Sequence, residues 1–169
     1  MKKYLSVVLC FILMTTVIFG AGSKVNAAIA EDVPPFPKAV IVSEHTQQVS
    51  DDTYVTDTIY EEPVYARAST YTKQGARVYT LRNSNGEALW QFTVQGTFSV
   101  TTGVSATCTN VTHSYEIYST SWKNVSASSY RSGNSAYGNA EFNRKLLGIT
   151  VETKGCSLVL SCDANGNLS

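Results

Sequence analysis

Hydrophobic and polar residues alternate along residues 89–100, in the middle of the chain. The positions of one parity are large and hydrophobic: Trp90, Phe92, Val94, Phe98 and Val100. Successive side chains of a strand point to opposite faces, so this period of two predicts a strand with one buried face and one solvated face. Gly96 interrupts the hydrophobic row and indicates a bend, a bulge or the close approach of another backbone.

Similar segments lie on both sides of this one and are separated by Gly, Asn or Ser. We expect strands at 77–81, 89–100, 104–108, 111–117, 136–142, 146–151 and 156–162. Asn85-Gly86, between the first two, is the dipeptide most typical of a type I′ hairpin turn. The hydrophobic parity changes at Thr109-Asn110, which predicts a bulge or a turn there, because a one-residue slip exchanges the two faces.

Two further segments carry specific expectations. Residues 146–151 are expected to form one strand with a bulge at Gly148, and its hydrophobic positions are Leu146, Leu147, Ile149 and Val151. The serine-rich connection around Trp122 and Val125 has a spacing that also allows one short helical turn.

Six or seven short antiparallel strands in about 100 residues predict an all-β domain, either a two-sheet sandwich of immunoglobulin-like size or a small barrel. The expected buried positions are bulky and aromatic, which suits two sheets about 10 Å apart and favours the sandwich. Serine and threonine account for 28 of residues 67–169, as suits exposed strand faces. We therefore expect a small β-sandwich over residues 67–169.

The first 27 residues have the pattern of a secretory signal peptide. Two lysines precede a hydrophobic run over residues 4–19, and Val25-Asn26-Ala27 suits cleavage after Ala27. A retained transmembrane anchor is the alternative, because residues 4–21 are 18 residues long, at the short edge of a bilayer span. We expect a secreted protein that meets the membrane only through this transient signal peptide.

Charge divides the rest of the chain into two parts. Residues 28–66 carry eight acidic residues and one lysine, a net charge of −7, and residues 67–169 carry nine basic and five acidic residues, a net charge of +4. Pro34-Pro35-Phe36-Pro37 disfavours helix, and the net charge is high while the apolar residues are not arranged on one face, so we expect a disordered acidic leader over residues 28–66. The alternatives are a propeptide cleaved at Tyr65-Ala66-Arg67 and an edge strand formed by residues 53–60.

Three cysteines follow the signal peptide, and export favours a disulfide between two of them. Cys156 and Cys162 are separated by roughly 20 Å along one strand, at about 3.3 Å per residue, whereas a disulfide needs Cα atoms within about 7 Å. Cys108 is therefore the shared partner. We expect the pair Cys108–Cys162, worth roughly 4 kcal/mol, with Cys108–Cys156 as the alternative. Cys156 is then expected to be a buried thiol.

Candidate catalytic and ligand-binding residues are sparse. His113 shares the hydrophobic parity of its strand, which is more typical of a core histidine than of a catalyst, and neither Gly-x-Ser-x-Gly nor Cys-x-x-Cys occurs. Residues 163–167 resemble the start of a calcium loop without its downstream glutamate, so a tight turn closed by Asp163 is the better interpretation. Scattered basic residues argue against nucleic acid. We expect no catalytic residue, no metal and no cofactor.

Exposed tyrosines are the one indication of a binding surface, because aromatic side chains favour recognition faces. The candidates are Tyr79, Tyr118, Tyr130 and Tyr137.

Residues 78–98, the Ala-Thr-Cys at 106–108 and the closing Leu-Ser-Cys-Asp-Ala-Asn-Gly-Asn-Leu-Ser at 160–169 resemble a family of small, uncharacterised secreted proteins of Gram-positive, clostridia-like gut bacteria. In that pattern an Asn-Gly turn joins a strand to a tryptophan-bearing strand, and the second of two cysteines precedes a terminal Asn-Gly turn. The resemblance implies export, a β fold and the pair Cys108–Cys162, with Cys156 as a departure. It implies no activity and no site residues.

Together these observations predict a non-enzymatic exported domain that recognises a cell-envelope or host extracellular molecule. Two alternatives stay open: a small secreted hydrolase using His113, and a precursor that is processed to an antibacterial or signalling factor.

Overall fold

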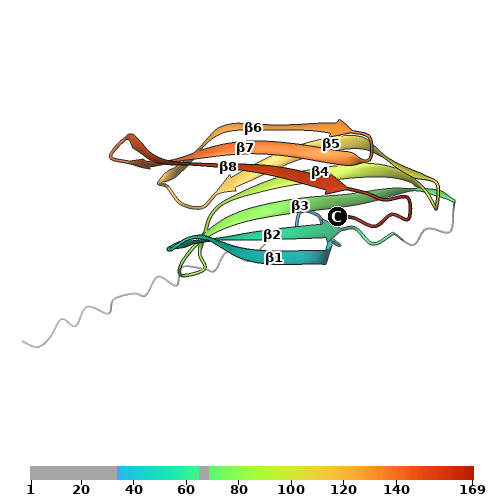
Figure 1. Ribbon diagram of the computed structural model, residues 1–169, viewed down its shortest axis with the longest axis horizontal. Coiled ribbons are helices and arrows are strands. Elements are labelled where there is room, and N and C mark those ends of the chain that lie inside the picture. Colours follow the sequence, from blue (N-terminus) through green and yellow to red (C-terminus); the bar gives the residue numbers. More distant parts are fainter. Residues whose placement is uncertain (1–33, 65–68) are drawn as a thin grey trace, which may run out of the picture.

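A computed structural model describes residues 34–64 and 69–169, where all regular secondary structure is β-strand (Figure 1). Eight strands follow one another along the chain: β1 (Val40–Ser50), β2 (Thr53–Glu61), β3 (Thr70–Asn83), β4 (Ala88–Thr101), β5 (Ser105–Ile117), β6 (Trp122–Ser132), β7 (Ser135–Leu146) and β8 (Ile149–Ser161). Among the described residues, no helix is long and apolar enough to cross a membrane.

The strands form two antiparallel sheets that lie face to face (Figure 1). One sheet has the order β1-β2-β3-β4-β5 and the other has the order β6-β7-β8, so the chain meanders through the first and crosses once to the second. The three-stranded sheet contacts β3, β4 and β5. The prediction of a small all-β sandwich is confirmed, with eight strands instead of six or seven.

The core is built on the inner face of β4. The predicted hydrophobic row of this strand is completely buried, at 0% exposure for each of its five residues. Trp90 stacks on Phe142 of β7 with ring centroids 4.0 Å apart, on Tyr79 at 5.7 Å, and meets Trp122 edge-on at 6.1 Å. This aromatic cluster joins the two sheets.

Glycines let the sheets approach closely beside this cluster. A Cβ at Gly138 of β7 would lie 2.0 Å from Val94 Cγ2 and 3.0 Å from the ring of Phe92. A Cβ at Gly96 would lie 2.7 Å from the Phe98 ring and 3.2 Å from Ala136 Cβ. The atoms that Gly96 admits are side-chain atoms of Phe98, on its own strand, and of Ala136 on β7, and not another backbone.

The predicted irregularity after Cys108 is a β-bulge. Thr97 of β4 pairs with Asn110, and Phe98 pairs with Cys108, which leaves Thr109 as the extra residue of β5. The bulge restores the hydrophobic parity, so residues before and after it face the same core. This prediction is confirmed.

The prediction of a disordered leader up to residue 66 is wrong for residues 40–61. β1 and β2 occupy these residues, and β2 pairs with β3 from Thr53↔Asn83 to Glu61↔Gly75. The acidic charge that suggested disorder is partly neutralised across the pair, because Asp57 contacts Arg77 at 2.6 Å and Glu61 contacts Lys73 at 2.8 Å. The predicted edge strand at 53–60 is β2, one strand inside the edge. The predictions for residues 1–33 and for cleavage at 65–67 lie outside the described residues.

The type I′ turn predicted at Asn85-Gly86 is wrong. In the Asn83–Gly86 turn only Gly86 has a positive φ, of 82°, and the Asn83 side chain accepts hydrogen bonds from the backbone N–H groups of Asn85 and Glu87. The turn with two positive φ values is Leu147-Gly148, at 50° and 84°.

Residues 146–151 therefore do not form one bulged, buried strand. Leu147 and Gly148 form the hairpin turn, Leu146 ends β7 and Ile149 begins β8, and the hydrophobic side chains of this segment are exposed. The serine-rich connection after Trp122 is β6, so the allowed helical turn is absent from residues 122–132. In both cases pairing with a neighbouring strand decided the local conformation.

We expect Gly138→Ala to destabilise the protein and Gly155→Ala to be nearly neutral. Both glycines lie in strands of the three-stranded sheet, but a Cβ at Gly155 meets only the Ala140 carbonyl oxygen, at 3.7 Å. Overpacking at Gly138 should lower the free energy of unfolding by about 1–3 kcal/mol, and the change at Gly155 should stay within about 0.5 kcal/mol. Urea unfolding measures both. Equal stabilities for the two variants would contradict the close contact between the sheets.

Candidate functional site

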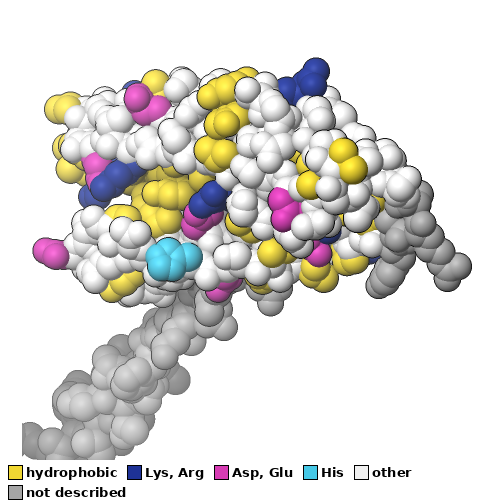
Figure 2. All heavy atoms as spheres, turned by 45° about the vertical axis from the view of Figure 1, so that its right-hand side comes forward, with side chains coloured by type: hydrophobic (Ala, Val, Ile, Leu, Met, Phe, Trp, Pro, Cys, Tyr) yellow, Lys and Arg dark blue, Asp and Glu magenta, His cyan; other side chains and the backbone are white. Residues whose placement is uncertain are grey.

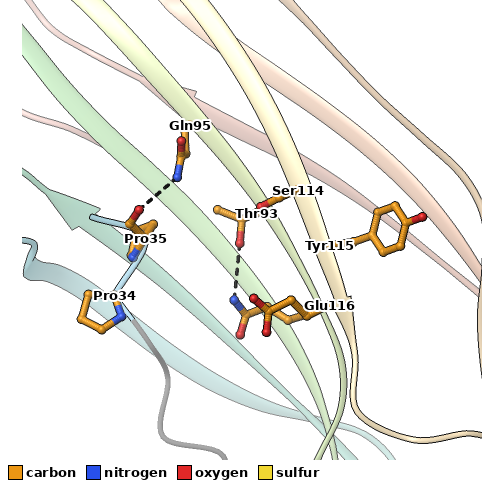
Figure 3. A pocket seen from close by; sticks show the side chains of 8 residues that line it. Pro34, Pro35, Thr93, Gln95, Ser114, Tyr115 and Glu116 are labelled. Carbon is orange, nitrogen blue, oxygen red and sulfur yellow. Dashed lines mark hydrogen bonds between the residues drawn. The ribbon is translucent and has the colours of Figure 1, made fainter. Parts of the chain in front are cut away.

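The outer face of the five-stranded sheet, turned away from the three-stranded sheet, carries a polar cavity of about 190 Å³. We call it the Pro34 pocket. Residues 34 and 35 form one side and β4 and β5 form the floor (Figure 3). The lining residues are Pro34, Pro35, Gln91, Thr93, Gln95, Ser114, Tyr115 and Glu116. The Tyr115 side chain points away from the others (Figure 3).

Strand alternation places the polar side chains of the pocket. The period of two that buries the hydrophobic residues of β4 turns Gln91, Thr93 and Gln95 to the outer face. Their paired residues on β5 are Glu116, Ser114 and Thr112. Two neighbouring strands therefore present two rows of hydrogen-bonding groups on a paired backbone.

The segment before β1 is held over this face by hydrophobic contacts. Phe36 and Ala39 pack against Tyr60, Ala76 and Val78 on the outer face of β2 and β3. The Gln95 amide donates a hydrogen bond of 3.3 Å to the Pro35 carbonyl (Figure 3). These contacts fix the proline side of the pocket.

Hydrogen bonds within the pocket are long. Gln91 donates to Thr93 and accepts from the Thr80 hydroxyl, each at 3.4 Å, and its Oε1 lies 3.4 Å from the Tyr118 hydroxyl oxygen. Such distances lie beyond the usual hydrogen-bond range. Gln91 and Thr93 are nevertheless 9% and 4% exposed. Buried polar groups in this state would gain from a ligand that supplies shorter hydrogen bonds.

A carboxylate lies at the edge of the pocket. The Tyr118 hydroxyl donates to Glu116 Oε2 at 2.7 Å, which orients the Glu116 side chain. A carboxylate accepts several hydrogen bonds, so one donor leaves capacity for others. The lining residues include no lysine or arginine. The pocket therefore suits a neutral ligand with hydroxyl groups better than an anion.

The structure distributes the four predicted tyrosines over three places. Tyr118 borders the Pro34 pocket through Glu116. Tyr130 and Tyr137 are paired across β6 and β7 and stack on each other, with centroids 4.8 Å apart and planes at 4°. They lie on the outer face of the three-stranded sheet, the face that also carries a polar depression of about 270 Å³ around Asn139 and Ser157. Tyr79 lies on the inner face of β3, against Trp90.

Tyr79 lines a third cavity, of about 170 Å³. Its other lining residues are His45, Gln47, Val49, Val55 and Asp57, on the inner faces of β1 and β2. Figure 2 shows a hollow between the two layers where hydrophobic side chains are visible, with charged side chains and a histidine around it. Burial raises the pKa of Tyr79, and the nearby Cys156 and Asp57 add to this effect.

His113 is exposed and is not a core histidine. Its Nδ1 lies 2.8 Å from Ser129 Oγ on β6, so the pair connects the two sheets. A serine hydrolase also needs an acid that orients the imidazole. Within residues 34–64 and 69–169, no carboxylate hydrogen-bonds to His113.

The three cysteines of the domain are free, buried thiols in the structure, and no disulfide joins any two of them. Cys108 and Cys162 lie at the same end of the sandwich, because their backbone N–H groups donate to the carbonyls of Gly133 and Asn134, two consecutive residues. Burial raises the pKa of Cys108, that of Cys156 to about 12 and that of Cys162 to about 11.

The turn at Asp163 is closed by its own side chain, as predicted. Asp163 Oδ1 accepts from the backbone N–H groups of Asn165 and Asn167, each at 2.8 Å, and Oδ2 accepts from the Asn167 amide. The side-chain hydrogen bond from Asn167, together with these backbone bonds, lowers the pKa of Asp163. The carboxylate is thus engaged by protein donors. No cluster of potential metal ligands occurs in the described part of the chain.

We expect the stability of the protein to decline above pH 9 partly because of Cys156. Burial raises the pKa of this thiol from 9.0 to about 12, so the unfolded chain loses the proton at a lower pH than the native state. The contribution of the neutral thiol is fully present below pH 9 and is lost as the pH rises toward 12.

Urea unfolding of the wild type and of Cys156→Ala at pH 8 and pH 10.5 tests this expectation. The wild type should lose about 1–2 kcal/mol more than the variant over this interval. The two proteins share all other titrating groups, so the difference between their losses of stability reports on Cys156 alone. Parallel losses in the two proteins would show that the native thiol titrates as it does in the unfolded chain.

Comparison with known proteins assigns no function. No family model, no curated protein and no solved structure matches the chain. The resemblance to secreted clostridia-like proteins therefore stays a prediction, and the chemistry of the Pro34 pocket has to indicate its ligand by itself.

Proposed function

We propose that this chain is an exported, non-enzymatic recognition protein that binds a neutral glycan of a cell envelope or of a host glycoprotein through the Pro34 pocket. The observation that carries the proposal is the composition of the pocket: two amides, the hydroxyl groups of Thr93 and Ser114 and one carboxylate, with no cation among the lining residues. The signal-peptide pattern of residues 1–27 supports export, with cleavage after Ala27.

Sugar hydroxyl groups donate and accept hydrogen bonds at once, and side-chain amides do the same. Gln91 and Gln95 each supply both functions, whereas Glu116 accepts from a hydroxyl and would repel a phosphate or sulfate. The rings of Pro34 and Pro35 add apolar surface at the opposite side of the pocket. Together these groups suit one sugar ring, with a polar edge toward the sheet.

The size of the pocket also limits the ligand. Its volume of about 190 Å³ lies below the roughly 300–1,000 Å³ of sites for drug-sized molecules. A single sugar residue held there should bind weakly, with a Kd on the order of millimolar, because about a dozen heavy atoms at the roughly 0.3 kcal/mol per atom typical of larger ligands give only about 4 kcal/mol. We therefore expect recognition of a repeating glycan, in which many copies of the residue raise the apparent affinity.

We expect Glu116→Gln and Gln95→Leu each to weaken glycan binding about tenfold, because each change removes hydrogen bonds to a sugar hydroxyl at nearly constant shape. Saturation-transfer NMR with the secreted protein and a panel of neutral envelope and host glycans measures binding. Thermal unfolding checks that both variants remain folded.

Tyr130→Ser in the other sheet is the matched control and should bind as the wild type does. The absence of saturable binding to any glycan would refute the proposal. Loss of binding in Tyr130→Ser with retention in the Pro34 pocket variants would place recognition on the three-stranded sheet and would equally refute the role of the pocket.

We further propose that the exported protein carries the Cys108–Cys162 disulfide and begins at Ala28. The hydrogen bonds that hold both cysteines to consecutive residues of the β6–β7 turn support this pairing. Non-reducing peptide mapping should find Cys108 linked to Cys162. Cys156 should react slowly with iodoacetamide at pH 8, since the thiolate is the nucleophile and its pKa is about 12. A Cys108–Cys156 link would overturn the pairing, and an N-terminus near Ala68 would indicate a processed precursor.

A further inference from the structure

The hairpin turn between β7 and β8 ends in an exposed hydrophobic tip. Leu146 is 62% exposed, Leu147 is 96% exposed and Ile149 is 69% exposed. We call these three residues the apolar tip. Val151, next to it on β8, is 50% exposed. Scattered exposed hydrophobic residues are ordinary, but a contiguous group at one point indicates a contact surface.

The backbone of the tip makes its hydrophobicity more unusual. Leu147 has a φ of 50° and Gly148 has a φ of 84°, so both central residues of the turn are left-handed. Asn, Asp and Gly favour such turns, and a leucine with positive φ is unfavourable. Leu147 is the one non-glycine residue with a positive φ in the described part of the chain. Neither turn propensity nor burial within the fold explains a leucine there.

The surroundings of the apolar tip are cationic. Lys145 directly precedes it and makes no ion pair within the described ranges. Arg144 contacts Glu152 at 3.3 Å, and Lys154 contacts the same carboxylate at 3.3 Å. With Lys123 on the neighbouring strand β6, the four cations near the tip face two acids, Glu141 and Glu152, which leaves a net charge of +2. The apolar tip thus has a positively charged base.

The shape of the hairpin distinguishes between possible contact partners. A two-residue turn is narrow and convex, and Figure 1 shows the β7–β8 turn projecting at one end of the sandwich. A protein partner with a flat interface would contact the face of a sheet. A convex apolar turn with cations at its base instead fits a lipid bilayer, in which acyl chains lie below anionic headgroups. Anionic lipid headgroups attract such cations by about 1 kcal/mol for each residue near the surface.

We propose that the apolar tip inserts into the interface of an anionic lipid bilayer and docks the exported protein on a membrane surface, a membrane contact in addition to the transient signal peptide that the sequence predicts. Leu146, Leu147 and Ile149 enter the boundary between headgroups and acyl chains. Lys145 and Arg144 stay at the level of the headgroups, which their long side chains allow. The inference is independent of glycan binding, because the Pro34 pocket lies on the outer face of the other sheet.

Vesicle flotation of the secreted protein tests the proposal, with phosphatidylcholine vesicles that contain or lack phosphatidylglycerol. The wild type should float with the anionic vesicles, and high salt should weaken this binding. Lys145→Gln should reduce binding to the anionic vesicles only. Glu116→Gln should float like the wild type, so failure of the glycan proposal and failure of this one are distinguishable.

Leu147→Asn is the decisive variant, because asparagine suits the left-handed turn while it removes the apolar side chain. Its partition coefficient should fall about tenfold or more, and its Tm should be equal to or higher than that of the wild type. Val104→Asn is the matched control: Val104 is 75% exposed at the β4–β5 turn, at the other end of the strands, and its loss should leave flotation unchanged.

Three outcomes would overturn the proposal. Absence of the wild type from the floating fraction of the anionic vesicles would leave a protein partner as the occupant of the tip. Leu147→Asn floating as well as the wild type would place membrane binding elsewhere. Equal losses in Leu147→Asn and Val104→Asn would show unspecific hydrophobic adsorption.

Discussion

The stack of Trp90 on Phe142 is the contact on which the rest of the structure depends. It joins β4 of the five-stranded sheet to β7, the central strand of the three-stranded sheet, with ring centroids 4.0 Å apart. Gly138, without a Cβ, lets Val94 and Phe92 come close to β7 beside the stack. The Trp90 indole Nε1 has no hydrogen-bond partner among the described residues. Apolar packing therefore outweighs the cost of about 1–3 kcal/mol that an unsatisfied polar group carries.

The unequal width of the two sheets follows from where this core lies. Three strands suffice to cover β3, β4 and β5, so the inner faces of β1 and β2 extend past β8. The Arg77 guanidinium closes part of this side, because it donates to the Asp57 carboxylate at 2.6 Å and to the Val159 carbonyl at 2.7 Å. These hydrogen bonds to Asp57 raise the pKa of Arg77. The Asp57–Arg77 ion pair thus links the acidic strand β2 to β3 in the same sheet, and the hydrogen bond to Val159 links Arg77 to the other sheet.

One strand serves both the core and the candidate site. The residues of β4 that face inward form the hydrophobic core, and those that face outward form the floor of the Pro34 pocket. The packing of one row therefore fixes the position of the other, which supplies the rigidity that a binding site for small polar ligands requires. The apolar tip differs from both, because its side chains contact little of the protein and face solvent.

By itself the sequence determined the β class, the amphipathic strand over residues 89–100, the bulge at Thr109, the turn at Asp163 and the burial of the Cys156 thiol. Alternation over residues 89–100 specifies the face of each residue because side chains alternate in any strand. It also placed Gln91, Thr93 and Gln95 together on an outer face, but a row of polar residues on a strand does not by itself predict a binding site. The sequence also identified the tyrosines, but only the order of the strands in the two sheets shows that Tyr79, Tyr118 and the Tyr130–Tyr137 pair lie in three different places.

Tertiary structure decided what local composition obscured. High negative charge favours disorder in an isolated segment, but ion pairs of Asp57 and Glu61 with β3 partly neutralise that charge once the strands pair. Two leucines and an isoleucine predict burial, yet a hairpin that extends past its partner sheet leaves them exposed. The wall formed by Pro34 and Pro35 depends on Phe36 reaching Tyr60 and Val78, a contact between residues distant in sequence. Local patterns specify faces of strands, whereas only long-range pairing specifies what each face meets.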